Sequence, residues 1–106
     1  MAMETVTLAR IYLREGEHLL ARLLDTLRDE RVRGVTVLRG IAGFGADREI
    51  RTAALADLAL DLPLVVEFYD RPERVAAILA HLEIQGGLAH IVSWPVTLHT
   101  PEADAR

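Results

Sequence analysis

The chain contains no cysteine and no lysine. Without cysteine it can form neither disulfides nor thiolate metal sites, which is compatible with a reducing compartment. Because all twelve basic residues are arginines, a bound anion must be held by guanidinium or backbone N–H groups. No apolar run approaches the ~20 residues that span a bilayer, and residues 1–4 lack the charged and apolar regions of a signal peptide. We therefore expect a cytoplasmic protein that does not insert into membranes.

Basic charge is also in deficit, because the net charge is −4. Nucleic-acid binding generally needs a basic face, so the composition disfavours that class of partner. The 106 residues fit a single domain, 1–106, and 51% of them are hydrophobic. Since soluble domains usually contain roughly 45–50% apolar residues, we expect this small domain to bury apolar surface against other subunits.

Hydrophobic periodicity predicts six elements in the order strand, helix, strand, strand, helix, strand. The second helix is expected to begin behind Asp70, with Asp70 as its cap and Glu73 completing a capping box, and to end at Gly86 and Gly87. The other expected elements are the strands 5–13, 35–38, 64–69 and 89–98 and the helix 17–31. The buried stripes of the two helices are predicted to be Leu20, Leu23, Leu24, Leu27 and Arg31, and Val75, Ile78, Leu79 and Leu82.

This order is typical of a ferredoxin-like βαββαβ sandwich, an α+β fold in which two helices cover one face of a four-stranded antiparallel sheet. Its usual strand order, 4-1-3-2, places the last strand at an edge. That position suits Pro95, which has no N–H to donate to a neighbouring strand. The second sheet face has no helices but still carries apolar residues, and oligomerisation is the simplest way to cover it.

Two segments fall outside the regular elements. Residues 46–62 form a longer connection than compact domains usually contain, and such connections are often functional. Its first part is charged and has no clear period, and residues 53–60 are expected to form a short helix with Leu55 and Leu58 inward. Residues 100–106 are expected to be a flexible polar tail.

The stretch 35–45 begins as a strand and then carries three glycines within six positions. Such glycines indicate positive-φ positions or a backbone that lies close to another group, and successive N–H groups can form an anion-binding nest. We expect an anion or nucleotide phosphate near Gly43, Gly45 and Arg48, with Arg39 at the base, because arginine binds phosphate bidentately. The alternative is that Arg39 makes an intersubunit ion pair and the glycines only shape the loop.

Three runs, residues 37–46 (VLRGIAGFGA), 50–53 (IRTA) and 61–67 (DLPLVVE), resemble a bacterial and archaeal family of PII-like proteins of unknown function. The similarity extends over nearly the whole chain. It implies a homotrimer of ferredoxin-like subunits whose sheets face inward, with a regulatory rather than enzymatic role. Some relatives are encoded beside fluoride exporters, so the implied partner is a membrane transporter.

In the wider PII superfamily a mobile T-loop leaves the second strand and docks on partner proteins, and adenine nucleotides bind between subunits. By similarity, Gly43, Phe44 and Gly45 are the entry to the T-loop, residues 46–62 are the T-loop, and Gly86 and Gly87 belong to a second nucleotide-binding loop. This chain has no lysine in the loop after the second helix, and the only arginine after that loop is Arg106. The implied effector is therefore either an adenine nucleotide or a different small ligand.

Two rival functions remain open. A cofactor-free isomerase or oxygenase on a ferredoxin-like dimer would need a cavity that contains a histidine or aspartate. An RNA-binding module would use aromatic residues on the first and third strands, for which Tyr12 with Phe68 or Tyr69 are the counterparts, but the acidic charge argues against it. No nucleophile lies beside a base, so no catalytic residue is expected. The histidines have no metal-ligand spacing, so no metal is expected either; they are His18, His81, His90 and His99.

Overall fold

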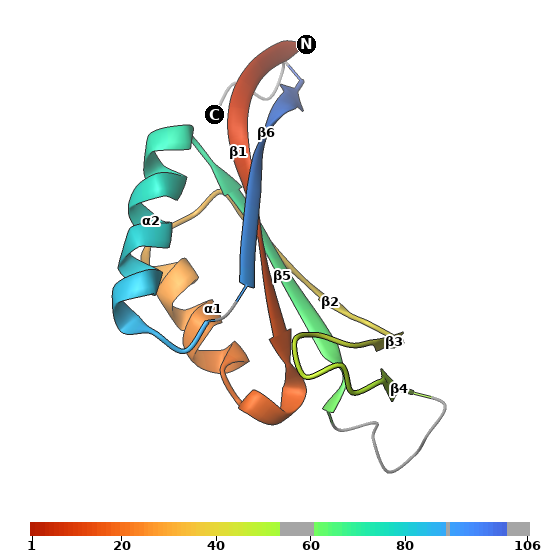
Figure 1. Ribbon diagram of the computed structural model, residues 1–106. Coiled ribbons are helices and arrows are strands. Elements are labelled where there is room, and N and C mark those ends of the chain that lie inside the picture. The colour runs from red at the N-terminus through yellow and green to blue at the C-terminus, as the bar shows by residue number, and fades with distance from the viewer. Residues whose placement is uncertain (54–60, 89, 102–106) are drawn as a thin grey trace.

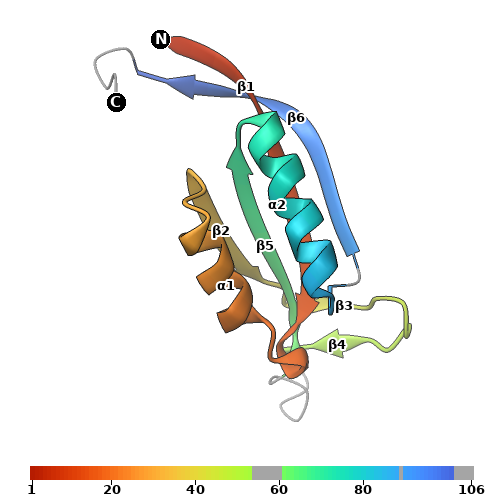
Figure 2. The ribbon, with the colours of Figure 1, turned by 90° about the vertical axis from the view of Figure 1, so that its left-hand side faces the viewer.

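Two helices lie on one face of a four-stranded antiparallel sheet, and no helix of the described residues covers the other face (Figures 1 and 2). This computed structural model describes residues 1–53, 61–88 and 90–101. The strand order is β2-β5-β1-β6, which confirms the predicted order and places the strand of Pro95 at an edge. A further two-stranded sheet, β3-β4, was not predicted. No helix in the described part of the chain is both long and apolar enough to cross a bilayer.

The helices are α1 (Leu20–Asp29) and α2 (Pro72–Gln85), and the 3-10 turn η1 (Glu15–Glu17) precedes α1. The strands are β1 (Ala2–Arg14), β2 (Gly34–Arg39), β3 (Ala42–Gly43), β4 (Arg51–Thr52), β5 (Pro63–Asp70) and β6 (His90–Thr100).

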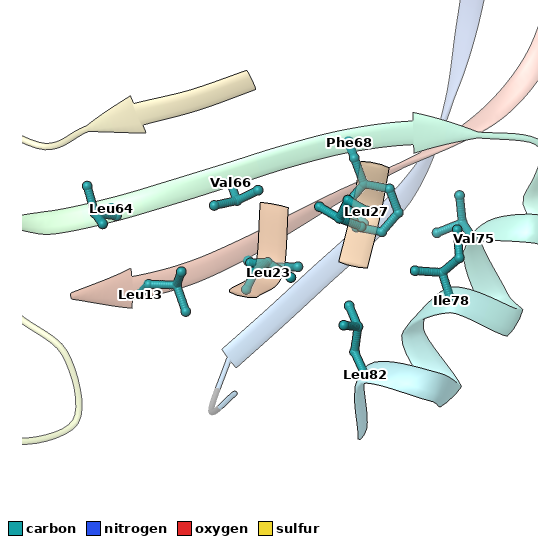
Figure 3. Close-up of a cluster of buried hydrophobic side chains, with 11 residues drawn as sticks. Leu13, Leu23, Leu27, Leu64, Val66, Phe68, Val75, Ile78 and Leu82 are labelled. Atoms are coloured by element: carbon teal, nitrogen blue, oxygen red, sulfur yellow. The ribbon is translucent and has the colours of Figure 1, made fainter. Parts of the chain in front are cut away.

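The hydrophobic core lies between the helices and the central strands β1 and β5 (Figure 3). Ile11, Val66 and Phe68 are 0% exposed because alternate residues of these strands point at the helices. The helices contribute the buried side chains of Leu23, Leu27, Val75, Ile78 and Leu82. The predicted stripes are therefore confirmed at their centres.

Both helix starts differ from the prediction. Residues 15–17 form the 3-10 turn, which ends where His18 adopts a left-handed backbone with φ 56°, so α1 begins only at Leu20. Arg31, expected in the buried stripe of α1, is exposed beyond the end of that helix. Asp70 is not the cap of α2, because it is the last, buried residue of β5 and its Oδ1 accepts a hydrogen bond from the Arg71 N–H at 2.7 Å.

Glycines end α2 as predicted, since Gly86 and Gly87 have φ of 76° and 88°. At the other end of the chain, β1 and β6 extend further than expected. Pairing with β5 stops at Thr7, but β1 continues to pair with β6 until Ala2 lies opposite Thr100. Residues 2–6 and 96–100 thus form a two-stranded ribbon beyond the sheet (Figure 2). Thr100 was expected in the tail but belongs to this ribbon, and 102–106 lie outside the described residues.

The sheet face opposite the helices, which we call the open face, is apolar and accessible. The strand register places Leu38 of β2, Tyr12 of β1 and Trp94 of β6 on it, and their exposed fractions are 48%, 41% and 38%. At its centre the Arg10 guanidinium donates to Glu67 at 2.8 Å through Nε and lies 5.5 Å from the Trp94 ring centroid. Because this charge pair is neutralised within the chain, the open face presents little net charge.

Candidate functional site

Beyond β2 the chain leaves the sheet on the side away from the helices and forms a small hairpin from β3 and β4 (Figure 1). The hairpin begins at Gly40, whose N–H donates to the Pro63 carbonyl at 2.8 Å, and closes where the Ala53 N–H donates to the Ile41 carbonyl at 2.8 Å. Its tip is a turn in which the Arg48 N–H donates to the Gly45 carbonyl at 2.9 Å. Arg48, the last residue of this turn, has a left-handed backbone, which is common in hairpin turns.

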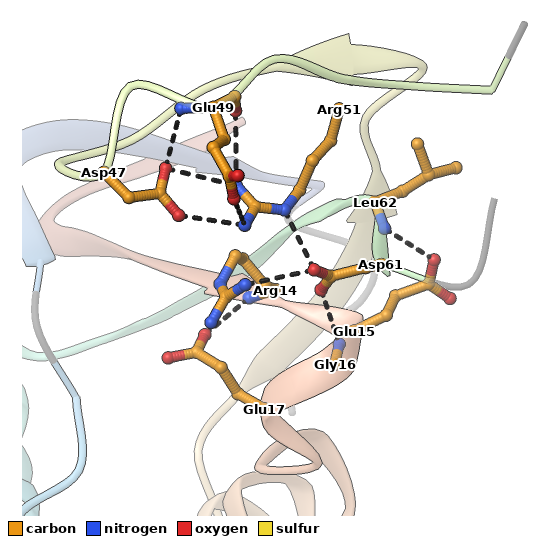
Figure 4. A network of polar contacts seen from close by, with 9 residues as sticks. All are labelled: Arg14, Glu15, Gly16, Glu17, Asp47, Glu49, Arg51, Asp61 and Leu62. Carbon is orange, nitrogen blue, oxygen red and sulfur yellow. Dashed lines mark hydrogen bonds and ion pairs between the residues drawn. The ribbon is translucent and has the colours of Figure 1, made fainter. Parts of the chain in front are cut away.

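The side chain of Arg51 holds this hairpin to the rest of the chain (Figure 4). The side chain is only 8% exposed, although it is charged. Its Nη2 lies 2.8 Å from Oδ2 of Asp47 and 3.1 Å from Oε2 of Glu49, and its Nε lies 2.9 Å from Oδ2 of Asp61. Both ends of segment 46–62 therefore meet at one guanidinium.

The same carboxylate is tied to the end of β1. Asp61 accepts hydrogen bonds from Nη1 of Arg14 at 3.0 Å and from the Gly16 N–H at 2.8 Å. Glu15 accepts a hydrogen bond from the Leu62 N–H at 3.1 Å. We call Arg14, Glu15, Arg51 and Asp61 the loop-base clamp, because together they fix segment 46–62 to the end of a central strand.

Hydrogen bonds from arginine side chains and backbone N–H groups stabilise the ionised form of the carboxylates around Arg51. Hydrogen bonds from Arg51 and from the Glu49 N–H lower the pKa of Asp47 to about 2. Burial alone would raise the pKa of Asp61, but hydrogen bonds from Arg51 and Gly16 outweigh it and the pKa is lowered. The same contacts with Asp47 and Asp61 raise the pKa of Arg51.

We expect substitution of Arg51 by methionine to raise the pKa of Asp47 from about 2 toward its ordinary value of about 3.9, since the Arg51 hydrogen bond is the largest cause of the shift while the Glu49 N–H bond remains. A depressed carboxyl pKa means that the ion pair supports the folded hairpin fully above about pH 4 and is lost as the pH falls through about 2. NMR titration of the Asp47 carboxyl checks this. Arg28→Met is the control, since Arg28 pairs with Asp25 on the surface of α1. An unchanged Asp47 titration in Arg51→Met would contradict the assignment.

Two glycines at the start of the hairpin, Gly40 and Gly43, are explained by close approach to Pro63 and not by positive φ. A Cβ on Gly43 would lie 3.1 Å from Cγ of Pro63, and a Cβ on Gly40 would lie 3.3 Å from Cβ of Pro63. Gly45 has open space around its α-carbon. Phe44, between these glycines, is 61% exposed. Gly40 and Gly43 thus let the hairpin lie against Pro63 at the start of β5.

The two arginines that sequence analysis assigned to an anion behave differently. Arg39 lies at the base as expected, but its Nη2 pairs with Oε1 of Glu15 at 2.9 Å within the same chain. Arg48 lies at the hairpin tip with φ 60°, an uncommon conformation for a residue with a side chain. Among the described residues the Arg48 side chain forms no hydrogen bond or ion pair. Of these two arginines, Arg48 is thus the one whose guanidinium has no ion-pair partner among the described residues.

The second predicted loop lies elsewhere. Gly86 and Gly87 follow α2, and a Cβ on Gly87 would lie 3.4 Å from Nη2 of Arg22 on α1. Figure 1 shows this loop on the helix side of the sheet and the β3–β4 hairpin on the other side. One subunit alone therefore does not bring the Gly43–Gly45 region and the Gly86–Gly87 region together.

Comparison with known proteins places these features in a family. Residues 6–98 match the family DUF190, described as "Uncharacterized ACR, COG1993". A UPF0166 protein from Aquifex aeolicus (strain VF5) is 36% identical over 69 residues, which cover 65% of this chain and 66% of that relative, slightly less than two-thirds of its length. A UPF0166 protein from Methanocaldococcus jannaschii is 32% identical over 78 residues, covering 69% of this chain and 71% of the relative.

Solved structures share the fold at low sequence identity. CPII, a nitrogen regulatory PII-like protein from Thiomonas intermedia K12 that was solved bound to ADP, AMP and bicarbonate, has a TM-score of 0.69 at 15% identity, over 92% of this chain and 91% of that chain. A putative PII-like signaling protein from Thermus thermophilus has a TM-score of 0.65 at 18% identity, over 92% and 91%. The predicted PII-like architecture is confirmed, and with residues 6–98 matched the chain belongs to the DUF190 family.

Proposed function

We propose that this protein is a cytoplasmic PII-like regulator that assembles as a homotrimer through its open face. It binds a small effector at the seams between subunits, with an adenine nucleotide as the first candidate, and controls a membrane transporter through segment 46–62. Its role is regulatory and not catalytic. The observation that carries the proposal is the loop-base clamp, because it couples both ends of that segment to a central strand of the sheet.

The open face supports the assembly. Exposed apolar side chains on one sheet face, such as Tyr12, Leu38 and Trp94, are typical of surfaces that other subunits cover. The central Arg10–Glu67 pair is already satisfied within the chain, so a partner need not supply an opposite charge. Closed symmetry would give each seam the same set of residues from two copies.

The separation of the two glycine regions supports a ligand at such a seam. Gly43, Phe44, Gly45 and Arg48 lie with the hairpin, whereas Gly86 and Gly87 lie on the other side of the sheet, so a ligand that contacts both sets needs two copies of the chain. In this arrangement Arg48 pairs with the phosphate, and Arg39 positions the base of the hairpin through Glu15. That CPII was solved with ADP and AMP makes adenine nucleotides the first ligands to test.

The signal follows from the position of Arg48 at the hairpin tip. An anion held by this guanidinium and by neighbouring N–H groups favours one arrangement of segment 46–62 over others, as in order–disorder switches. The ligand shifts the equilibrium only by its difference in affinity for the arrangements.

We expect Arg48→Asn to weaken adenine-nucleotide binding roughly 10- to 100-fold, since a hydrogen bond to a charged group contributes about 1.5–3 kcal/mol. Asparagine tolerates the left-handed backbone that Arg48 adopts, so the substitution removes the charge without straining the turn. Titration calorimetry with ADP, AMP and ATP measures the change, and Arg28→Asn on the surface of α1 is the matched control. Absence of heat from any nucleotide with the wild-type chain would rule out the nucleotide version of the proposal.

A further inference from the structure

We infer that the outward face of the β3–β4 hairpin, around Phe44 and Ile50, packs against a second copy of this chain. The hairpin is then part of the subunit interface and not a free arm. This inference rests on the assembly proposed above and adds a contact to it.

The hairpin has two distinct faces. In the paired register Gly43 lies opposite Arg51, and both face the chain's own body. Gly43 lies against Pro63, and the guanidinium of Arg51 reaches Asp61. Alternation along a strand turns the neighbouring pair, Ala42 and Thr52, to the opposite face.

Phe44 directly follows β3 and Ile50 directly precedes β4, and continuing the same alternation by one residue turns both to this outward face. Phe44 is 61% exposed and Ile50 is 66% exposed. Ile41, which precedes β3, is also exposed, at 80%. The chain has only two phenylalanines, and the other, Phe68, is 0% exposed in the core. Large apolar side chains gathered in this way mark a surface that is covered in the functional protein.

Three of the charged side chains of the hairpin pair with one another. Asp47 and Glu49 both pair with Arg51, so these three charges are drawn together toward the inward side. A partner that covers Phe44 and Ile50 therefore meets two carboxylates that already have an arginine partner. An uncharged, aromatic-containing centre is what interfaces between protein subunits have.

The occupant is a second copy because the patch continues the open face. Leu38 of β2 is 48% exposed on that face, and the chain runs from it through Gly40 directly to Ile41. The hairpin also projects to the same side of the sheet as the open face (Figure 1). A copy that covers the open face thus lies beside the hairpin, and symmetry repeats the contact at each seam.

Site-specific photo-crosslinking tests the inference. Phe44 is replaced by the photoreactive p-benzoylphenylalanine, which keeps an aromatic ring at the position, and Ile84 is replaced likewise as control. Ile84 is 86% exposed on α2, on the helix side of the molecule. The mass of each irradiated protein is read on denaturing gels, and its assembly before irradiation by light scattering.

We expect the Phe44 variant to yield a covalent adduct of two chains, with the crosslinked peptide mapping to the sheet of the second copy, and the Ile84 variant to yield none. A trimer in solution whose Phe44 variant forms no interchain adduct would overturn this inference while leaving the assembly intact. A wild-type monomer in solution would overturn the proposed assembly, and this inference with it.

Discussion

Replacing Leu38 by glutamate should convert the assembled protein into monomers, lowering the mass measured by light scattering to that of one chain. Leu38 is 48% exposed on the open face, and its cross-strand neighbour on that face is the apolar Val65. In the isolated subunit the new carboxylate stays in water. In the assembly each copy would bury one such carboxylate, and removing it from water costs several kcal/mol per ion. Symmetry repeats that cost at every seam, so the dissociation constant should rise by at least about 1,000-fold.

Ile84→Glu is the matched control for Leu38→Glu. Ile84 is also an aliphatic residue, 86% exposed, but it lies on α2 on the opposite side of the molecule. Its replacement should leave the mass unchanged. If both variants keep the wild-type mass, the open face is not the assembly surface.

Phe68→Ala should be the most destabilising of the substitutions considered, costing about 3–5 kcal/mol of unfolding free energy. The ring is 0% exposed and packs among side chains of both helices and the central strands (Figure 3). Truncation leaves a cavity that the surrounding helices can only partly close. Domains of this size are stable by roughly 5–15 kcal/mol, so the midpoint of thermal unfolding should fall by roughly 15 °C or more.

The chain's second phenylalanine provides the control. Phe44→Ala should change the unfolding free energy of an isolated subunit by only about 0.5 kcal/mol, since its side chain is 61% exposed. Both substitutions are best compared by urea unfolding in the monomeric Leu38→Glu background, where assembly does not contribute to apparent stability. Equal losses from the two substitutions would contradict the assignment of Phe68 to the core.

The architecture could be predicted from sequence because its signals are local. Leu23 and Leu27 repeat at helical spacing, and both are buried. Pro95 restricts its strand to an edge, and that strand is β6 at the edge of the sheet. Gly86 and Gly87 end α2 through their left-handed backbones. Each of these signals depends on neighbours a few residues away, which a sequence displays directly.

The loop-base clamp escaped prediction because its partners are distant in sequence. Arg14 and Asp61 are 47 positions apart, and Arg51 is 10 from Asp61. Residues 46–51 are mostly charged and show no hydrophobic repeat of helix or strand period, so the sequence did not predict the β3–β4 hairpin either. The turn residue Asp47 was the available local cue, since its Oδ1 accepts a hydrogen bond from the Glu49 N–H at 2.9 Å.

The error at Asp70 has a similar cause. Asp70 followed by Pro72 and Glu73 reads as a helix start, but tertiary contacts place this carboxylate in β5. It is 5% exposed, and Nε of Arg33 lies 3.7 Å from its Oδ1. The pairing of β5 with β1 continues as far as Asp70 opposite Thr7. Asp70 is therefore part of the strand and does not cap α2.

The ribbon formed by residues 2–6 and 96–100 gives the subunit two poles. Ala2 and Thr100 are paired at one pole, and the β3–β4 hairpin lies at the other (Figure 1). A fluorophore or affinity tag attached near either Ala2 or Thr100 would therefore be located at the same end of the molecule, remote from the hairpin. Immobilising the protein by that pole should leave its hairpin end directed away from the support.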